Sequence, residues 1–288
     1  MARHVANKDF GQHFLVDENI LRVIERLAGL APEDVVLEIG PGLGALTVFL
    51  AARVARVHAV ELDRTLELPL AEALAPHPNA TVTYGDALRL DLAALQPAPG
   101  KLVANLPYNV ATPIVVESLD GLPSVQSWCV MVQREVADRF FASPGTKAYG
   151  GVSVLIRLAT VRSGFHPVSR EVFRPRPNVE SALVAFRRER PLPVEWRRLK
   201  RVVEGAFAHR RKTLPNSLEL AGVARRAQAV AALEAIGLRP ETRAEAIEPE
   251  GFLALDAALA AGEGAPPGAG APAGAPPHAG APPDSAPH

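Results

Sequence analysis

The sequence predicts a doubly wound α/β domain followed by a small helical domain. Over the first two thirds of the chain, short runs of β-branched and aliphatic residues alternate with Ala- and Leu-rich segments of helical length. Such runs suit strands that are buried on both faces, and their alternation with helices is typical of right-handed β-α-β units in a parallel sheet. Beyond Pro191 the alternation stops and only helical patterns remain. The chain therefore divides into an α/β part and a helical part.

The α/β part is expected to contain the following elements. Strands are predicted at residues 35–39, 57–60, 81–84, 102–104, 128–132 and 182–186. Crossover helices are predicted at residues 43–55 and 66–74, because these segments have the length and the Ala and Leu content of helices. A Pro-rich stretch at residues 173–178 leads into the last strand.

The helical part begins with an apolar stripe. Apolar residues recur there at the spacing of one helix face, at Leu199, Val202, Val203, Ala206 and Phe207. Two more amphipathic segments follow at residues 227–236 and 252–261. We therefore expect an α/β domain over residues 1–189 and a small helical domain over residues 190–261.

The end of the chain has a composition that packed domains do not use. Of the 27 residues in 262–288, 22 are Gly, Ala or Pro. A segment of this kind cannot bury enough apolar surface to offset the loss of chain entropy. We therefore expect residues 262–288 to be disordered.

Composition also excludes several classes of protein. No apolar run approaches the ~20 residues of a membrane span, and residues 1–8 lack the apolar segment of a secretory signal. Cys129 is the only cysteine, which excludes a disulfide framework and a cysteine-rich metal site. We expect a cytoplasmic protein in which Cys129 is a small buried apolar residue.

Charge is segregated along the chain. The formal net charge is zero, yet residues 134–226 hold 20 Lys and Arg against 8 Asp and Glu, and the remainder holds 11 against 23. A basic half indicates a polyanionic partner such as nucleic acid, although a solvated basic face gives the same pattern.

Each of the first four expected strands is followed by a residue suited to binding a ligand, namely Gly40, Glu61, Asp86 and Asn105. Because ligands of open α/β sheets bind at the carboxyl ends of strands, these residues should line one crevice. Gly40 opens a Gly-Pro-Gly-Leu-Gly turn, where the backbone can approach a ligand just before a helix. Glu61 is placed to accept the hydroxyls of a ribose, and Asp86 to accept the amine of adenine. An adenosine-containing cofactor is therefore expected.

These residues leave the choice of cofactor open. NAD enzymes carry Gly-x-Gly-x-x-Gly in the same place, whereas the spacing here is Gly-x-Gly-x-Gly. Glu38 lies in an otherwise apolar strand, and a buried carboxylate needs a partner such as the ammonium group of a methionine moiety or a backbone amide. Purely structural roles also remain open, for Glu61 as a helix cap and for Asp86 as a turn residue.

The most specific segment is Asn105-Leu106-Pro107-Tyr108. The amine of adenine is a poor nucleophile because its lone pair is delocalised into the ring. The side-chain oxygen of Asn105 and a backbone carbonyl, that of Leu106, can accept the two amine hydrogens and favour a pyramidal nitrogen. Pro107 fixes the turn, and Tyr108 offers a flat face to an extruded base. A Pro-stabilised loop with a buried tyrosine is the structural alternative.

Together these motifs resemble one family, the ribosomal RNA adenine dimethyltransferases, which modify two adjacent adenosines near the 3′ end of small-subunit ribosomal RNA. The resemblance extends over about residues 8–255. The matching segments are KDFGQHFL at 8–15, LEIGPGLG at 37–44, NLPYN at 105–109, FRPRP at 173–177 and FAHRRKTL at 207–214.

The resemblance implies a Rossmann-like class I methyltransferase domain that uses S-adenosylmethionine and no metal. Cofactor contacts would come from His13, Leu15, Gly40, Glu61, Asp86 and Asn105, and residues 1–16 would close over the cofactor. The catalytic corner would be Asn105, Leu106, Pro107 and Tyr108, and the target adenosines would enter over Tyr108. The implied partner is small-subunit ribosomal RNA or a precursor of the 30S subunit.

Some positions depart from the family pattern. His13 stands where Asn is common, and Asn178 and Glu180 replace a frequent Lys and Asp. His13 could instead cap the helix that begins near Asp17.

A basic cluster follows the apolar stripe of the helical part, at Arg210, Arg211 and Lys212. Cations at a helix end are also expected from the helix dipole alone. We expect this cluster to form an RNA rim that binds the RNA backbone, together with Arg134, Arg139, Arg174 and Arg176.

Three alternatives remain open at this point. The first is a sister enzyme that methylates large-subunit (23S) ribosomal RNA and confers antibiotic resistance. The second is a ribosome-assembly factor that acts mainly by binding. The third is an NAD-linked oxidoreductase, which would leave the Asn105 to Tyr108 segment unexplained. The protein is expected to be a monomer.

Overall fold

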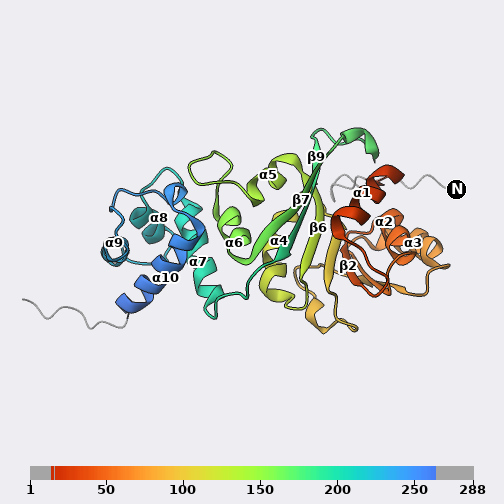
Figure 1. The fold of residues 1–288 in the computed structure, drawn as a ribbon, viewed down its shortest axis with the longest axis horizontal. Helices are drawn as coiled ribbons and strands as arrows, with labels where there is room; N and C mark the ends of the chain where they lie inside the picture. The colour runs from red at the N-terminus through yellow and green to blue at the C-terminus, as the bar shows by residue number, and fades with distance from the viewer. Residues whose placement is uncertain (1–13, 16, 264–288) are drawn as a thin grey trace, which may run out of the picture.

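A mixed β-sheet forms the centre of the protein. The computed structural model describes residues 14–15 and 17–263. The strands of the sheet are β2 (Val35–Ile39), β3 (Arg56–Glu61), β4 (Ala80–Tyr84), β5 (Lys101–Asn105), β6 (Ser127–Gln133), β7 (Thr160–Val168) and β9 (Ser181–Arg188). Their order across the sheet is β4-β3-β2-β5-β6-β9-β7 (Figure 1). All the strands predicted from the sequence are confirmed, each with bounds within a few residues of those expected.

The sheet is parallel from β4 to β6 and antiparallel beyond. β9 pairs antiparallel with both β6 and β7, so its first residue, Ser181, lies opposite Gln133 at the carboxyl end of β6. The sequence did not predict β7. This edge strand contains Gly164 and Pro167 and a register shift between Arg162 and Gly164, which interrupt a regular strand pattern and are tolerated at a sheet edge.

Both faces of the sheet are buried at β2, β3, β5 and β6, as the continuous apolar runs predicted. The same expectation is wrong for β4, an edge strand whose residues are exposed or only partly buried. Neighbouring residues of a strand enter different cores, as Val36 and Leu37 of β2 do. One face is covered by α1 (Glu18–Ala28) and α2 (Ala45–Ala51), and the other by α4 (Ala111–Gly121), α5 (Arg134–Phe140) and α6 (Gly151–Ala159). Cys129 is buried in the core between the sheet and the helices α1 and α2, as expected. Burial raises the pKa of its thiol to about 12.

One of the two predicted crossover helices is shorter than expected. The second predicted crossover helix is confirmed as α3 (Glu67–Leu74), but the helix predicted over residues 43–55 spans only α2. Gly44 is the N-cap of α2, with a φ of 85°. At the other end, the side-chain amide of Asn79 donates to the carbonyl oxygens of Ala51 and Val54, at 2.8 and 3.0 Å, and satisfies groups that a longer helix would have paired internally.

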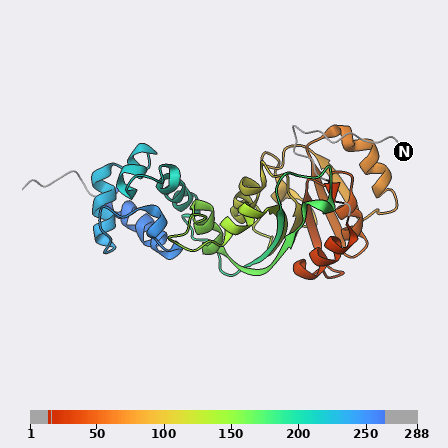
Figure 2. The ribbon, with the colours of Figure 1, turned by 90° about the horizontal axis from the view of Figure 1, so that it is seen from above.

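The C-terminal region is helical, as predicted. It contains α7 (Trp196–Ala208), α8 (Leu214–Leu220), α9 (Arg226–Ala235) and α10 (Pro249–Glu263), which lie at the opposite end of the molecule from α1, α2 and α3 (Figures 1 and 2). The predicted stripe on α7 points inward, since Leu199, Val202, Val203 and Ala206 are buried and Phe207 packs against them. The region joins the α/β part through α6, where the Tyr149 hydroxyl just before that helix donates to the Ile247 carbonyl oxygen at 2.7 Å.

The chain ends are only partly described. α10 continues to Glu263, so the first two residues of the predicted tail are helical, and residues 264–288 lie outside the described residues. Near the N-terminus, β1 (Phe14–Leu15) pairs antiparallel with β8 (Phe173–Arg174). Asp17 is the N-cap of α1 and accepts from the N–H groups of Asn19 and Ile20, so this cap is not made by His13. Within the described residues, no helix combines the length and the apolar character needed to cross a membrane.

Candidate active site

A crevice of about 440 Å³ opens at the carboxyl ends of the parallel strands. Its walls include the residues that end or directly follow β2, β3, β4 and β5 and the loop between β5 and α4. The structure thereby brings together the predicted site residues Gly40, Glu61, Asp86, Asn105, Leu106, Pro107 and Tyr108. Apolar side chains complete the walls, among them Leu43, Leu62 and Leu88.

The glycine-rich loop is hydrogen-bonded to Glu61. The Gly42 N–H donates to Glu61 Oε2 at 3.0 Å, and the Asp63 N–H donates to Oε1 at 2.9 Å. Asp63, not Glu61, caps the short helix that follows, so the capping alternative for Glu61 is wrong. Burial raises the pKa of Glu61, and the N–H groups of Asp63 and Gly42 oppose that rise. A carboxylate oxygen can accept more than one hydrogen bond, so this side chain retains capacity for ligand hydroxyls.

Glu38 is a buried acid in the floor of the crevice. Its side chain is 1% exposed, and no described residue forms a hydrogen bond with its Oε2 atom. Burial, together with the nearby charge of Glu61, raises the pKa of Glu38 to about 8, although the adjacent Thr47 side chain acts in the opposite direction. An unsatisfied buried carboxylate of this kind is stabilised by a cationic partner.

Asp86 shapes a turn as well as lining the crevice. Its Oδ1 atom accepts from the N–H of Leu88 at 3.0 Å, and its Oδ2 atom lies 3.4 Å from Arg89 Nε. Asp86 is therefore a turn residue, which is the structural alternative that the sequence left open. A role toward a ligand remains a prediction for this residue.

The Asn105 to Tyr108 corner is held at several points. The Leu106 N–H donates to the Met131 carbonyl oxygen at 3.1 Å, whereas no described residue donates to the carbonyl oxygen of Leu106 itself. The Tyr108 hydroxyl lies 2.6 Å from Ser181 Oγ. Burial raises the pKa of Tyr108, so its phenol is neutral and can donate at physiological pH. A carbonyl acceptor and an amide side chain thus stand side by side at the strand end.

This set of groups fits an adenosine-containing ligand that carries a cation. Glu61 can accept ribose hydroxyls, and the orphaned oxygen of Glu38 can accept an ammonium group. Within the described residues, no group of three or more His, Cys, Asp or Glu side chains is arranged to hold a metal ion.

The structure distinguishes the members of the predicted RNA rim. Ion pairs hold four of them at distances of 3.1 to 3.5 Å, namely Arg134 to Asp138, Arg139 to Glu135, Arg176 to Glu171 and Arg210 to Glu245. Among the described residues, Arg211 and Lys212 have no carboxylate within ion-pair distance. These two cations are therefore the members of the rim most available to a phosphate.

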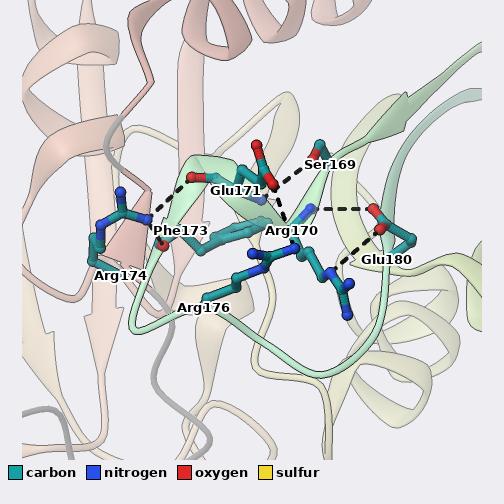
Figure 3. Close-up of polar contacts among 7 residues, drawn as sticks. All are labelled: Ser169, Arg170, Glu171, Phe173, Arg174, Arg176 and Glu180. Carbon is teal, nitrogen blue, oxygen red and sulfur yellow. Dashed lines mark hydrogen bonds and ion pairs between the residues drawn. The ribbon is translucent and has the colours of Figure 1, made fainter.

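The remaining member, Arg174, ends β8, within the loop between β7 and β9 that is braced by its own polar groups (Figure 3). Its Nη1 atom donates to the carbonyl oxygens of Phe173 and Glu171, at 3.0 and 3.3 Å. Across the loop, Glu180 Oε2 accepts the N–H of Arg170 at 3.1 Å (Figure 3). Hydrogen bonds within the chain thus hold the shape of this loop.

Two predicted cofactor contacts cannot be placed in full. His13 lies outside the described residues, and of Leu15 only its backbone place in β1 is described. Sequence reasoning in turn missed Ser181, the hydrogen-bond partner of Tyr108. The two residues are 73 positions apart, so no local pattern relates them.

The comparisons with known proteins identify the family of this chain. The model of the family "Ribosomal RNA adenine dimethylase" matches residues 3–260. A protein of Rubrobacter xylanophilus named "Ribosomal RNA small subunit methyltransferase A" is 47% identical over 248 residues, which are 86% of this chain and 93% of that protein.

Solved structures agree on the fold. A dimethyladenosine transferase of Plasmodium falciparum superposes with a TM-score of 0.73 at 22% identity, over 87% of this chain and 98% of that one. The 23S rRNA methyltransferase ErmE superposes with a TM-score of 0.60 at 30% identity, over 86% and 99%. The expected Rossmann-like methyltransferase fold with a C-terminal helical region is thereby confirmed, and the chain belongs to the ribosomal RNA adenine dimethylase family.

Proposed function

We propose that this protein transfers methyl groups from S-adenosylmethionine to the N6 amines of two adjacent adenosines near the 3′ end of small-subunit ribosomal RNA. The observation that carries the proposal is the Asn105 to Tyr108 corner at the mouth of the crevice. There the Leu106 carbonyl oxygen accepts no hydrogen bond from any described residue, beside an amide side chain and an aromatic ring.

The corner can raise the nucleophilicity of an adenine amine. Asn105 and the Leu106 carbonyl would accept the two N6 hydrogens, which draws the lone pair out of the ring and toward the crevice. S-adenosylmethionine supplies a methyl group on a positively charged sulfur. In a single displacement the N–C bond forms as the S–C bond breaks, the sulfur keeps the electron pair, and the nitrogen then loses a proton to water. The step needs no covalent enzyme intermediate, and its rate depends chiefly on the proximity and orientation of the two reactants.

The cofactor would lie along the strand ends. Glu38 would take the ammonium group of its methionine end, Glu61 the ribose hydroxyls and Asp86 the adenine amine. Gly40 would let the backbone approach it closely. His13, Leu15 and residues 1–16 would complete the site from above, as part of the same proposal.

The choice of RNA follows the more similar relative. The relative that is 47% identical is named for the small subunit, whereas the large-subunit enzyme ErmE is 30% identical. A precursor of the 30S subunit is the proposed partner, bound through the RNA rim by a monomer in the cytoplasm. An α/β domain over residues 1–189 and a helical RNA-binding domain over residues 190–261 complete this proposal.

Methylation of both ribosomal RNAs in parallel tests the proposal. Small subunits and large-subunit RNA that lack the modification are incubated with the protein and labelled cofactor, and the modified positions are read by primer extension and mass spectrometry. We expect dimethylated adenosines in the small-subunit RNA alone. Methylation of the large-subunit RNA alone, or none of either, would refute it. The Asn105→Ala variant should lose transfer yet still bind subunits.

A further inference from the structure

Ser181 is a buried hydroxyl at the edge of the active site. It is 1% exposed and begins β9, where it pairs with Gln133 of β6 on one side and Val168 of β7 on the other. A residue paired with strands on both sides has little freedom to move. The position of its hydroxyl is therefore set by the sheet.

The residue before it is also fixed. The Glu180 carbonyl oxygen accepts the N–H of Arg134 at 2.9 Å, where α5 begins. Its carboxylate accepts the N–H of Arg170 at 3.1 Å and lies 3.7 Å from Arg170 Nε (Figure 3). These contacts anchor the approach to β9 at both the main chain and the side chain.

Tyr108, in contrast, lies in the turn between β5 and α4 and is only partly buried. Its hydroxyl is 2.6 Å from Ser181 Oγ. Rotation of a phenol about its Cβ–Cγ bond leaves the hydroxyl in place, so a contact at the hydroxyl fixes the direction in which the side chain points. Because Ser181 is held in the sheet and Tyr108 lies in a turn, Ser181 sets the position of Tyr108.

We infer that Ser181 is a positioning residue for methyl transfer: its hydroxyl holds Tyr108 in the direction that supports the extruded adenine against the Asn105 corner. This inference rests on the proposed function. It assigns to the Pro-rich loop and β9 a role in the reaction, because Glu180 and Ser181 connect that loop to the tyrosine.

Removal of the Ser181 hydroxyl should have a different kinetic effect from removal of a purely structural serine hydroxyl. Without the hydroxyl, Tyr108 would still offer a surface for the base but would hold it less well oriented. Loss of orientation lowers kcat more than it raises KM. A neutral hydrogen bond contributes about 0.5–1.5 kcal/mol, so we expect kcat to fall roughly 2- to 13-fold in Ser181→Ala.

A double-mutant cycle tests the inference. Ser181→Ala, Tyr108→Phe and the double variant are compared with the wild type for kcat, for KM toward unmodified small subunits and for melting temperature. The fall in kcat caused by Ser181→Ala should vanish when Tyr108 is already Phe, and Ser181→Thr, which keeps the hydroxyl, should restore most of kcat. Ser217→Ala is the matched control, since its buried hydroxyl donates to the Gly205 carbonyl oxygen at 2.7 Å, in the helical region. It should lower the melting temperature and leave kcat unchanged.

The outcomes separate this inference from the function on which it rests. A wild-type protein without methyl transfer would overturn the proposed function. An active wild type with an equal effect of Ser181→Ala in both backgrounds, or with no effect at all, would overturn only the role of Ser181. If Ser181→Ala does not fold, Tyr108→Phe alone decides: the inference requires its kcat to fall, and full kcat would contradict it.

Discussion

Gly40 lies so close to Pro107 that a β-carbon on Gly40 would stand 3.2 Å from Pro107 Cδ. The glycine directly follows β2, and the proline belongs to the corner proposed to hold the adenine. The two halves of the proposed reaction, methyl donor and methyl acceptor, therefore meet at a point where an added β-carbon would press against Pro107.

Gly40→Ala should disturb both halves. Gly40 has a φ of 77°, and a left-handed conformation costs a residue with a β-carbon roughly 1–2 kcal/mol. The contact with Pro107 adds to that cost, so we expect lower stability by urea denaturation and weaker cofactor binding by calorimetry. Gly29→Ala is the matched control: its φ is 54°, and nothing lies within 4 Å of the added carbon. It should lose stability and keep cofactor affinity; equal affinity losses in both variants would contradict the contact.

Glu38→Gln should change how stability depends on pH. The pKa of Glu38 is raised to about 8 in the folded protein, above its ordinary value of 4.5, so the folded state holds a proton that the unfolded state releases. The stabilisation from this group is complete below pH 4.5 and is lost as pH rises through 8. Urea denaturation from pH 5 to 8 should therefore show the variant gaining stability relative to the wild type as pH rises. Parallel profiles would show that folding does not raise the pKa of Glu38.

Glu61→Gln should weaken binding of S-adenosylmethionine. Hydrogen bonds to a charged acceptor contribute about 1.5–3 kcal/mol, so we expect affinity to fall roughly 10- to 100-fold. Thermal unfolding with each ligand provides the measurement. S-adenosylmethionine should raise the melting temperature of the wild type more than that of the variant, and NAD should raise neither. Stabilisation by NAD alone would favour the oxidoreductase alternative.

Removal of unpaired cations should weaken RNA binding in a salt-dependent way. Arg211 and Lys212 form no ion pair among the described residues, so we expect Arg211→Ala with Lys212→Ala to lower RNA affinity. Each lost phosphate contact should flatten the plot of log affinity against log salt by about 0.7–0.9. Arg22→Ala with Arg26→Ala removes the same charge from α1, at the opposite end of the molecule, and should leave the slope unchanged (Figure 1). An equal change of the slope in both double variants would indicate a general effect of charge.

Much of the site was predictable because it follows the strands. The β-branched and aliphatic runs fix where β2, β3, β4 and β5 end, and in a parallel sheet those ends lie at one edge. Gly40, Glu61, Asp86 and Asn105 could therefore be placed together without coordinates. The chemistry proposed for the Asn105 corner rests on residue type alone.

The remaining features depend on contacts between distant segments. β7 has no regular strand pattern, and its place is set by pairing with β9. The contact of Tyr108 with Ser181 depends on the antiparallel register of β9, which local sequence does not encode. The pKa of Glu38 depends on complete burial, and the pairing of Arg139 with Glu135 and Arg210 with Glu245 decides which rim cations remain available.

A structure of the protein with a non-reactive cofactor analogue and a small-subunit RNA fragment tests the central claim most directly. The account predicts an extruded adenine whose N6 atom lies at hydrogen-bond distance, about 2.7–3.2 Å, from the Asn105 side-chain oxygen and the Leu106 carbonyl oxygen. Its ring would rest against Tyr108, with the donor sulfur on the far side of the nitrogen. An adenine bound elsewhere, or a cofactor sulfur remote from this corner, would contradict it.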